Sequence, residues 1–249
     1  MERRDVWRSK LIGPTVDAKR EIYYAYVAGR RDIEPSALQT IRSDMPRTYH
    51  EHAELRAEMK TVKKLLVQYA AVHRGDSYLQ GFNYIMTILW YVFKGQQHGE
   101  ADTWWCFSRI VGLIRPLMPD FNVTWFHWMR RHWLGQFNQE LRQRRPKLAS
   151  ILCDRTEEFS SLVTVRWFMI WFAQTVAFTD IFKLWDFIID QPPHLLMKTY
   201  TMLTFQILYE AAPSITYQWS HEPTKLMHAF LSLHVEGIDH AIAEAKKRL

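Results

Sequence analysis

The stretch "MKTVKKLLVQYA" at residues 59–70 is the segment that most directly indicates the fold class. Its lysines fall on one face of a helix, and its apolar residues recur at helical spacing on the other face: Met59, Val62, Leu66, Tyr69 and Ala70. Such a stripe is typical of a helix that packs one side against a core. Alternation of the kind that marks a β-strand never persists beyond a few residues. The chain has only 9 glycines in 249 residues, which also favours helices over a turn-rich β fold.

Prolines, glycines and short polar segments divide the rest of the sequence into helix-sized pieces. Segment 163–189 is apolar around most of its circumference, and the stretch "QTVAFTD" at 174–180 is expected to split it into two helices. No internal repeat and no low-complexity stretch is visible, and no linker divides the chain. The sequence therefore predicts a single all-α domain over residues 1–249, built from roughly ten or more helices.

The formal net charge of +6 comes partly from two short basic clusters, at residues 142–147 and 246–248. A solvated loop and a helix end are the ordinary interpretations of such clusters. A basic rim for an acidic protein or a lipid surface is the alternative. Basic residues interleaved with exposed aromatic residues along one face are not evident, so we expect no nucleic-acid partner.

Other features of the sequence predict a cytoplasmic protein without a cofactor of its own. Cys106 and Cys153 form no CxxC pair, which fits a reducing compartment. Residues 1–10 lack the apolar core of a signal peptide, and the apolar run 85–93 is too short to span a bilayer. No metal-binding spacing and no glycine-rich phosphate loop is present, so we expect neither a metal site nor a nucleotide site.

The stretch "IRSDMPRT" at residues 41–48 contains the first candidate functional residue. Pro46 lacks an N–H and disfavours helical geometry at the preceding residue, so a helix is expected to end near Asp44. This places Arg47 at the start of a loop, with its side chain free to point outward. Taken alone, a surface salt bridge is the ordinary interpretation of this arginine.

The stretch "SYLQGFNYI" at residues 77–85 contains the second candidate. Gln80 precedes Gly81, after a polar turn and before a nearly all-apolar helix. A glutamine in this position is, taken alone, most simply interpreted as a residue that caps the helix. The glycine would let another backbone approach closely.

The two stretches together resemble the TBC (Tre-2/Bub2/Cdc16) domain, a family of all-helical activators of Rab GTPases. The matching residues follow the patterns IxxDxxRT and YxQG: Ile41, Asp44, Arg47, Thr48, Tyr78, Gln80 and Gly81. Segment 4–13 looks like the family's opening helix, and segment 163–190 looks like its later tryptophan-rich part. The sequence departs from the family at Ser77 and Phe82, which affects the shape of the loop.

The resemblance implies a catalytic pair made of Arg47 as an arginine finger and Gln80 as a glutamine finger. The other residues of the two patterns are expected to support this pair or to contact the partner: Ile41, Asp44, Thr48, Tyr78 and Gly81. An arginine supplied in trans stabilises the negative charge that develops during phosphoryl transfer, and an amide can orient the attacking water.

The implied function is that of a GTPase-activating protein for a GTP-bound Rab-family small GTPase in vesicle trafficking. The GTP and Mg²⁺ belong to that partner, so the chain would supply catalytic residues without a substrate pocket of its own. Peripheral association with endomembranes would come through the partner. Two alternatives stay open at this point. One is a TBC-fold binding module or scaffold with weak catalysis, and the other is a helical binder of nucleic acid or phospholipid that uses the basic clusters.

Overall fold

The computed structural model of the protein describes residues 1–29, 32–73, 78–114, 135–144, 146–152, 167–219, 225, 228–229 and 232–249. The regular structure of these segments is helical, apart from one isolated parallel β-bridge between Val176 and Val235. The prediction of an all-α fold is therefore confirmed. The chain forms two compact units, residues 1–115 and residues 116–249. A single domain over residues 1–249 stays a prediction.

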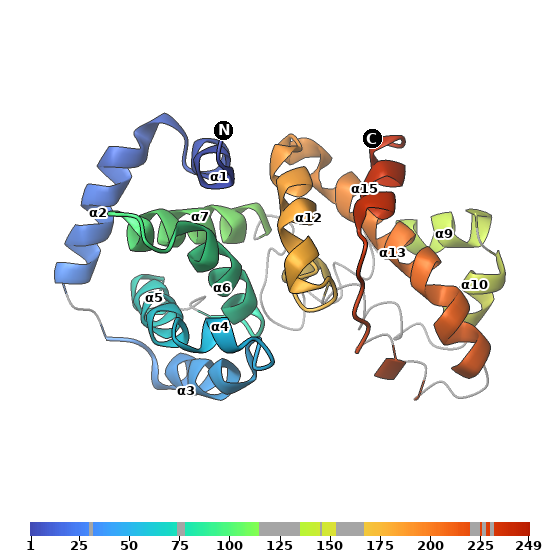
Figure 1. Ribbon diagram of the computed structural model, residues 1–249, viewed down its shortest axis with the longest axis horizontal. Coiled ribbons are helices and arrows are strands. Elements are labelled where there is room, and N and C mark those ends of the chain that lie inside the picture. Colours follow the sequence, from blue (N-terminus) through green and yellow to red (C-terminus); the bar gives the residue numbers. More distant parts are fainter. Residues whose placement is uncertain are drawn as a thin grey trace. The chain divides into compact units, whose positions relative to one another are not determined.

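The first unit is built around two helices that pack against each other, α6 and α7 (Figure 1). Helices α1 and α2 pack on α7, α5 packs on α6, and α3 packs on α5. The elements of this unit, in chain order, are α1 (Arg3–Leu11), the 3₁₀ turn η1 (Gly13–Thr15), α2 (Val16–Ala28), α3 (Pro35–Asp44), the 3₁₀ turn η2 (Met45–Arg47), α4 (Ala53–Arg56), α5 (Met59–Val72), α6 (Phe82–Phe93) and α7 (Gly99–Ile114).

Helix α5 contains the stripe on which the fold prediction rests. Val62, Leu66, Tyr69 and Ala70 are buried as the helical spacing predicts, whereas Met59 is half-buried at the first turn. Ring contacts extend this core. Tyr69 packs edge-on against Phe107 of α7 at a centroid distance of 4.7 Å, and at 5.7 Å from Trp104. Aromatic burial of this kind supplies much of the stabilisation of a helical core.

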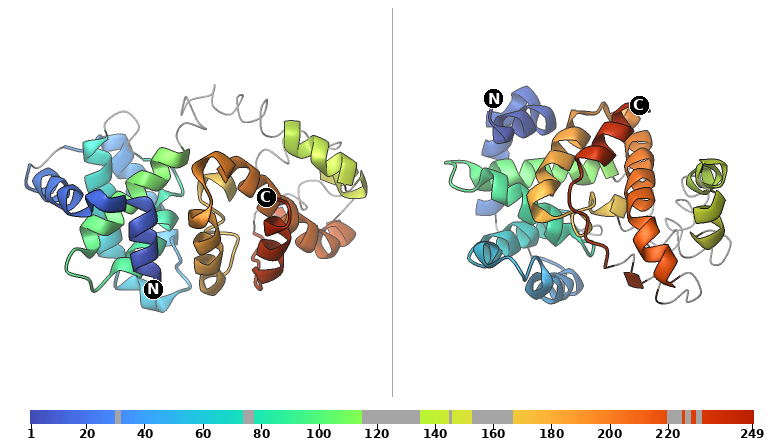
Figure 2. Two further views of the ribbon diagram at one scale, coloured as in Figure 1. Left: turned by 90° about the horizontal axis from the view of Figure 1, so that it is seen from above. Right: turned by 45° about the vertical axis from the view of Figure 1, so that its right-hand side comes forward.

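The second unit holds the later part of the chain. Figure 2 shows α9 beside α10, and α15 alongside α13, in agreement with their close packing. Its described elements are α9 (Gly135–Arg144), α10 (Pro146–Leu152), α12 (Phe178–Asp190), the 3₁₀ turn η5 (Pro193–Leu195), α13 (Leu196–Trp219) and α15 (Asp239–Lys246).

The tryptophan-rich segment is divided as the sequence predicts. Residues 167–169 are helical, a series of turns follows, and α12 begins at Phe178. Residues 163–166 lie outside the described part of the chain. Trp185 on α12 is fully buried, and its indole N–H donates to the carbonyl oxygen of Trp171 at 3.0 Å. Both tryptophans therefore stabilise the scaffold of this unit.

The remaining predictions on clusters and cysteines have mixed outcomes. The basic cluster at 142–147 is not a loop in its described part, because Arg144 ends α9 and Pro146 begins α10. The cluster at 246–248 begins at Lys246, the last residue of α15, as expected for a helix end. Cys106 is a buried free thiol, and burial raises its pKa. Cys153 lies outside the described residues.

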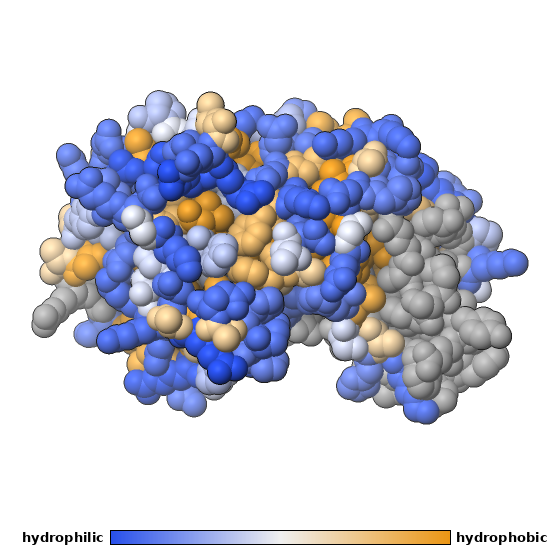
Figure 3. Space-filling model, viewed as in Figure 1, coloured by the Kyte–Doolittle hydropathy of each residue, from blue (hydrophilic) through white to orange (hydrophobic). Residues whose placement is uncertain are grey.

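The visible face of the first unit is largely hydrophilic, with smaller apolar areas (Figure 3). Among the described residues, the large apolar side chains that are clearly exposed include Ile22, Tyr24 and Val27 on α2 and Tyr91 on α6. None of the helices in the described part of the chain combines the length and the apolar character that crossing a membrane requires.

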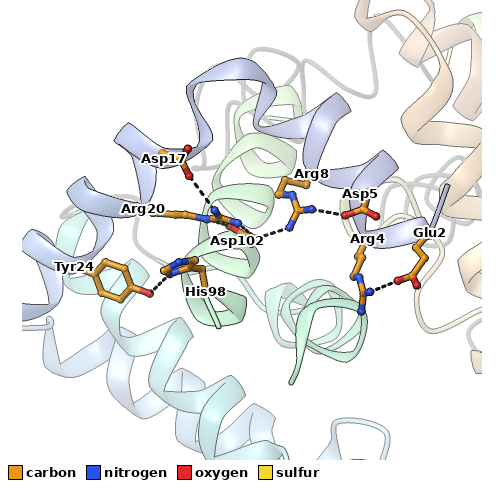
Figure 4. A network of polar contacts seen from close by, with 9 residues as sticks. All are labelled: Glu2, Arg4, Asp5, Arg8, Asp17, Arg20, Tyr24, His98 and Asp102. Atoms are coloured by element: carbon orange, nitrogen blue, oxygen red, sulfur yellow. Dashed lines mark hydrogen bonds and ion pairs between the residues drawn. The ribbon is translucent and has the colours of Figure 1, made fainter. Parts of the chain in front are cut away.

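A buried carboxylate joins three helices of the first unit (Figure 4). Asp102 on α7 is fully buried and receives two hydrogen bonds from Arg20 on α2, at 2.8 and 2.7 Å. Arg8 on α1 reaches the same carboxylate at 3.2 Å. The hydrogen bond to Asp102 raises the pKa of the Arg20 guanidinium. Because a buried charge needs its partners, this contact fixes α1 and α2 on α7.

We expect Asp102→Asn to lower the free energy of unfolding by about 3–5 kcal/mol, because both arginines lose a buried counter-charge. Asp17→Asn is the matched control. Asp17 binds the same Arg20 at 3.0 Å, but its side chain is 88% exposed, so its loss is expected to cost about 0.5 kcal/mol or less. Urea unfolding followed by circular dichroism measures both. Equal losses for the two variants would contradict this account.

Candidate functional site

Arg47 is the last residue of η2, the 3₁₀ turn that directly follows helix α3. Helix α3 ends at Asp44, as Pro46 predicts, and the chain tightens into a 3₁₀ turn over Met45–Arg47. Side chains three residues apart lie over one another in a 3₁₀ turn. This geometry brings the guanidinium of Arg47 onto the carboxylate of Asp44, with which it forms an ion pair.

The burial of the two partners differs sharply. The side chain of Arg47 is 54% exposed, whereas that of Asp44 is 1% exposed. The surface salt bridge considered for Arg47 from the sequence is therefore present, but its acid is a buried one. A buried carboxylate needs donors on both oxygens. Arg47 is thus held at the surface by a group that is itself fixed inside the fold.

The second donor to Asp44 is Tyr78, which comes from the other sequence motif. The hydroxyl group of Tyr78 donates to Asp44 Oδ2 at 2.7 Å and also lies 3.1 Å from Oδ1 of Asn83. Burial, together with the neighbouring carboxylate of Asp44, raises the pKa of Tyr78 above its ordinary value. The hydroxyl therefore stays protonated at neutral pH and acts as a donor.

Asn83, in the first turn of α6, makes a second connection between the motifs. Its side chain is fully buried. Its Nδ2 donates to the hydroxyl of Thr48 at 2.7 Å, and that hydroxyl donates to the carbonyl of Asp44 at 2.9 Å. Its Oδ1 accepts the backbone N–H of Gly81 at 3.1 Å. Residues 44–48 and 78–83 are therefore joined by hydrogen bonds through two side chains, Tyr78 and Asn83.

Gln80 stands immediately before the helix and is exposed. The residue at the N-cap of α6 is Gly81, with φ of 105°, and its N–H is bound by Asn83. The interpretation of Gln80 as the capping residue is therefore wrong. No described residue hydrogen-bonds the side chain of Gln80. The structure therefore fixes the backbone next to Gln80, through the N–H of Gly81, and not its side-chain amide.

Gly81 has a structural reason to be glycine. A positive φ of 105° is rarely adopted by residues with a Cβ, so another residue here would strain the turn. Gly81 is also buried. Its expected role of leaving room for a partner is not visible in the structure, which instead shows a turn that presents Gln80.

The other predicted residues lie beneath the surface. Ile41 is fully buried on α3, and Thr48 is 2% exposed within the polar network. Both are placed to support the loop of Arg47. The sequence-based prediction missed Asn83. The only signal for it was a polar residue at the start of a nearly all-apolar helix. Tyr84 was also missed; its hydroxyl donates to the carbonyl oxygen of Arg47 at 3.1 Å.

The comparisons with known proteins agree with the motifs. A family model described as the Rab-GTPase-TBC domain matches residues 3–210. The chain belongs to the Rab-GTPase-TBC domain family. This match includes both motifs and spans parts of both compact units. The family resemblance seen in the sequence is therefore confirmed.

Among its relatives in this TBC family is human TBC1 domain family member 17, which is 25% identical over 182 residues. The alignment covers 73% of this chain and 26% of that protein. Mouse TBC1 domain family member 13 is 24% identical over 200 residues, covering 74% of this chain and 45% of that protein. The chain thus spans less than half the length of these relatives.

We expect Tyr78→Phe to lower the free energy of unfolding by about 1.5–3 kcal/mol, because a buried carboxylate loses a hydrogen-bond donor. Tyr84→Phe is the comparison variant, because it removes a hydroxyl that donates to an uncharged carbonyl; about 0.5–1.5 kcal/mol is expected. Chemical denaturation at pH 7 measures the two. A Tyr78→Phe variant no less stable than wild type would mean that Asp44 does not need this donor.

Proposed function

We propose that the protein accelerates GTP hydrolysis by a Rab-family small GTPase, with Arg47 and Gln80 supplied in trans. The observation that carries the proposal is that hydrogen bonds connect the segment of Arg47 with the segment of Gln80 in a chain of the TBC family. Both side chains are exposed, yet each comes from a segment that the same buried hydrogen-bond network holds. Two exposed side chains that come from segments held by one buried network suit a site that acts on a partner.

The chemistry of GTP hydrolysis explains why these two residue types are useful together. Negative charge spreads over the transferring phosphoryl group and the leaving oxygen, so catalysis depends on positioning and on charge stabilisation. The guanidinium of Arg47 is planar, permanently charged and able to bind two oxygens at once. The amide of Gln80 can both donate to and accept from the attacking water.

The magnitudes favour a catalytic role for an exposed arginine. An arginine finger accelerates hydrolysis by about 10³–10⁵-fold, which corresponds to roughly 4–7 kcal/mol of barrier. A solvent-exposed ion pair contributes far less, about 1 kcal/mol or below, and the arginine of this pair is 54% exposed. To reach a phosphate, Arg47 would leave Asp44, whose carboxylate keeps the hydrogen bond from Tyr78.

The partner would be the GTP-bound form of the Rab, and it would bring the GTP and Mg²⁺. The chain would need no cofactor of its own. It would act in the cytoplasm in vesicle trafficking, with peripheral association with endomembranes through the GTPase. The names of the relatives support a TBC-family role for this chain without specifying a Rab or a compartment.

A second candidate function is a TBC-fold module that binds a small GTPase without activating it. The observation in its favour is the ion pair itself, since Arg47 is already engaged by Asp44. If the ion pair between Arg47 and Asp44 is kept when the partner binds, Arg47 only anchors its loop. Measuring binding and hydrolysis on the same GTPase separates the two functions.

We expect Arg47→Ala to reduce the stimulated rate of hydrolysis by about 10³-fold or more, with binding of the GTPase reduced much less, because the charge is needed mainly in the transition state. Arg47→Lys is expected to recover little, because an ammonium lacks the planar fork. Single-turnover phosphate release from a panel of GTP-loaded Rab proteins measures both variants.

Arg42→Ala is the control for this change. Arg42 is an exposed arginine on α3, the helix that ends just before η2, so its removal alters the net charge equally. It is expected to leave activation within about twofold, as for an ordinary surface substitution. Arg47→Ala that melts like wild type and still activates the best Rab within a few fold would show that Arg47 is not a finger.

Gln80 is tested in four combinations: the wild-type chain or Gln80→Ala, each with a wild-type Rab or with a Rab whose switch glutamine is changed to alanine. If Gln80 orients the water, a Rab whose own switch glutamine is changed to alanine should still be activated. Gln80→Ala should then cost about 10²–10³-fold in rate, the scale for one well-placed polar catalytic group. Gln97→Ala, an exposed glutamine of the α6–α7 loop, is the control. Activation that survives loss of Gln80 but vanishes with the Rab glutamine would leave Arg47 as the only finger.

A further inference from the structure

Asn83 is the only described residue whose amide group is hydrogen-bonded to both motif segments. Through Nδ2 it donates to Thr48, next to Arg47 in sequence, at 2.7 Å. Through Oδ1 it accepts the N–H of Gly81, next to Gln80, at 3.1 Å. Its side chain has no exposed surface, so it cannot touch a bound GTPase. Whatever it contributes to function must act through its two neighbours.

We propose that Asn83 is a positioning residue that sets the placement of Gln80 relative to Arg47. This inference rests on the proposed function. The two catalytic side chains lie on separate turns, and neither residue is part of an α-helix. Without a connection, each turn would move on its own, and a misplacement of about 1 Å can cost about 10²-fold in rate.

The chemistry of an amide fits this role better than its alternatives. The site needs one donor, for the Thr48 hydroxyl, and one acceptor, for the Gly81 N–H. An aspartate in place of Asn83 could accept but not donate at neutral pH. It would also bring a second buried carboxylate near Asp44, to which Tyr78 already connects it. A leucine could do neither, and would leave the Gly81 N–H without its acceptor.

The link through Tyr78 does not replace this one. Tyr78 joins Asp44 to the second segment two residues before Gln80. Asn83 instead binds the backbone of Gly81, whose φ of 105° defines the turn that presents the glutamine. Tyr78 thus holds the carboxylate that binds Arg47, and Asn83 holds the backbone that presents Gln80. Both are needed to fix one finger relative to the other.

Thr48→Val tests the connection without substituting Asn83 itself. Asn83 tolerates substitution less well, because its amide is fully buried and hydrogen-bonded on both sides. Thr48→Val removes the acceptor of Asn83 Nδ2 and leaves the Oδ1 contact with Gly81 available. Thr87→Val is the matched control, because Thr87 is equally buried and its hydroxyl bonds the backbone carbonyl of Asn83 at 2.7 Å. Thr48→Ser keeps the hydroxyl and is the conservative rescue.

The first measurement is amide hydrogen exchange of Gly81 by NMR on the chain alone. We expect Thr48→Val to speed this exchange by about tenfold or more, because Asn83 loses the bond that orients its amide. Thr87→Val and Thr48→Ser should leave it within about threefold of wild type. Unchanged exchange in Thr48→Val would overturn the proposed link, whatever the activity.

The second measurement is single-turnover phosphate release from a Rab that the wild-type chain activates. We expect Thr48→Val to lower the maximal rate by about 10-fold to 10²-fold and to change the half-saturating concentration by less than about threefold. Thr48→Ser should restore the rate. A rate loss shared equally by Thr87→Val, or faster Gly81 exchange with an unchanged rate, would overturn the positioning role.

The two measurements keep this proposal separate from the proposed function. If the wild-type chain activates no Rab, the proposed function fails and the positioning role fails with it, while the exchange result still decides whether the link exists. If the wild-type chain is active but Thr48→Val behaves like wild type in both assays, only the role of Asn83 is overturned.

Discussion

The buried carboxylate of Asp44 is the constraint on which the candidate site depends. A carboxylate that is 1% exposed is costly unless donors satisfy it, and the fold supplies one donor from each motif, Arg47 and Tyr78. The need to satisfy this single group therefore brings two distant segments of sequence together. It also leaves an arginine at the surface whose side chain is held by a buried carboxylate. An exposed cation held in this way is available to a partner without being disordered.

A similar arrangement appears elsewhere in the first unit and serves a different purpose. Asp102 is also buried and also binds arginines, but its partners Arg8 and Arg20 come from helices that pack on α7 (Figure 4). There the ion pairs hold the scaffold together. At Asp44 the arginine follows the helix on a short 3₁₀ turn and remains 54% exposed. The two ion pairs therefore differ in the exposure of the arginine.

Much of the fold could be predicted from sequence because its signals are local. The helical stripe of residues 59–70, the end of α3 ahead of Pro46 and the break within 174–180 each follow from neighbouring residues. The pairing of Asp44 with Arg47 is local too, since it depends on a spacing of three residues.

The rest of the site depends on contacts between distant segments, which spacing does not reveal. The role of Asn83 could not be predicted, because its partner Thr48 lies 35 residues earlier. Gln80 was open to interpretation as a cap because sequence alone does not give the φ angle of Gly81. The basic cluster at 142–147 was read as a loop because charge does not distinguish a loop from two adjoining helix ends.

The most direct test of this account is a crystal structure of the chain bound to a Rab carrying GDP, Mg²⁺ and aluminium fluoride, which imitates the transferring phosphoryl group. The account predicts that the guanidinium of Arg47 has left Asp44 for the fluoride and the leaving oxygen, and that the amide of Gln80 contacts the attacking water. The bonds among Asp44, Tyr78 and Asn83 should be unchanged. A complex in which Arg47 still binds Asp44 and Gln80 points away from the nucleotide would contradict it.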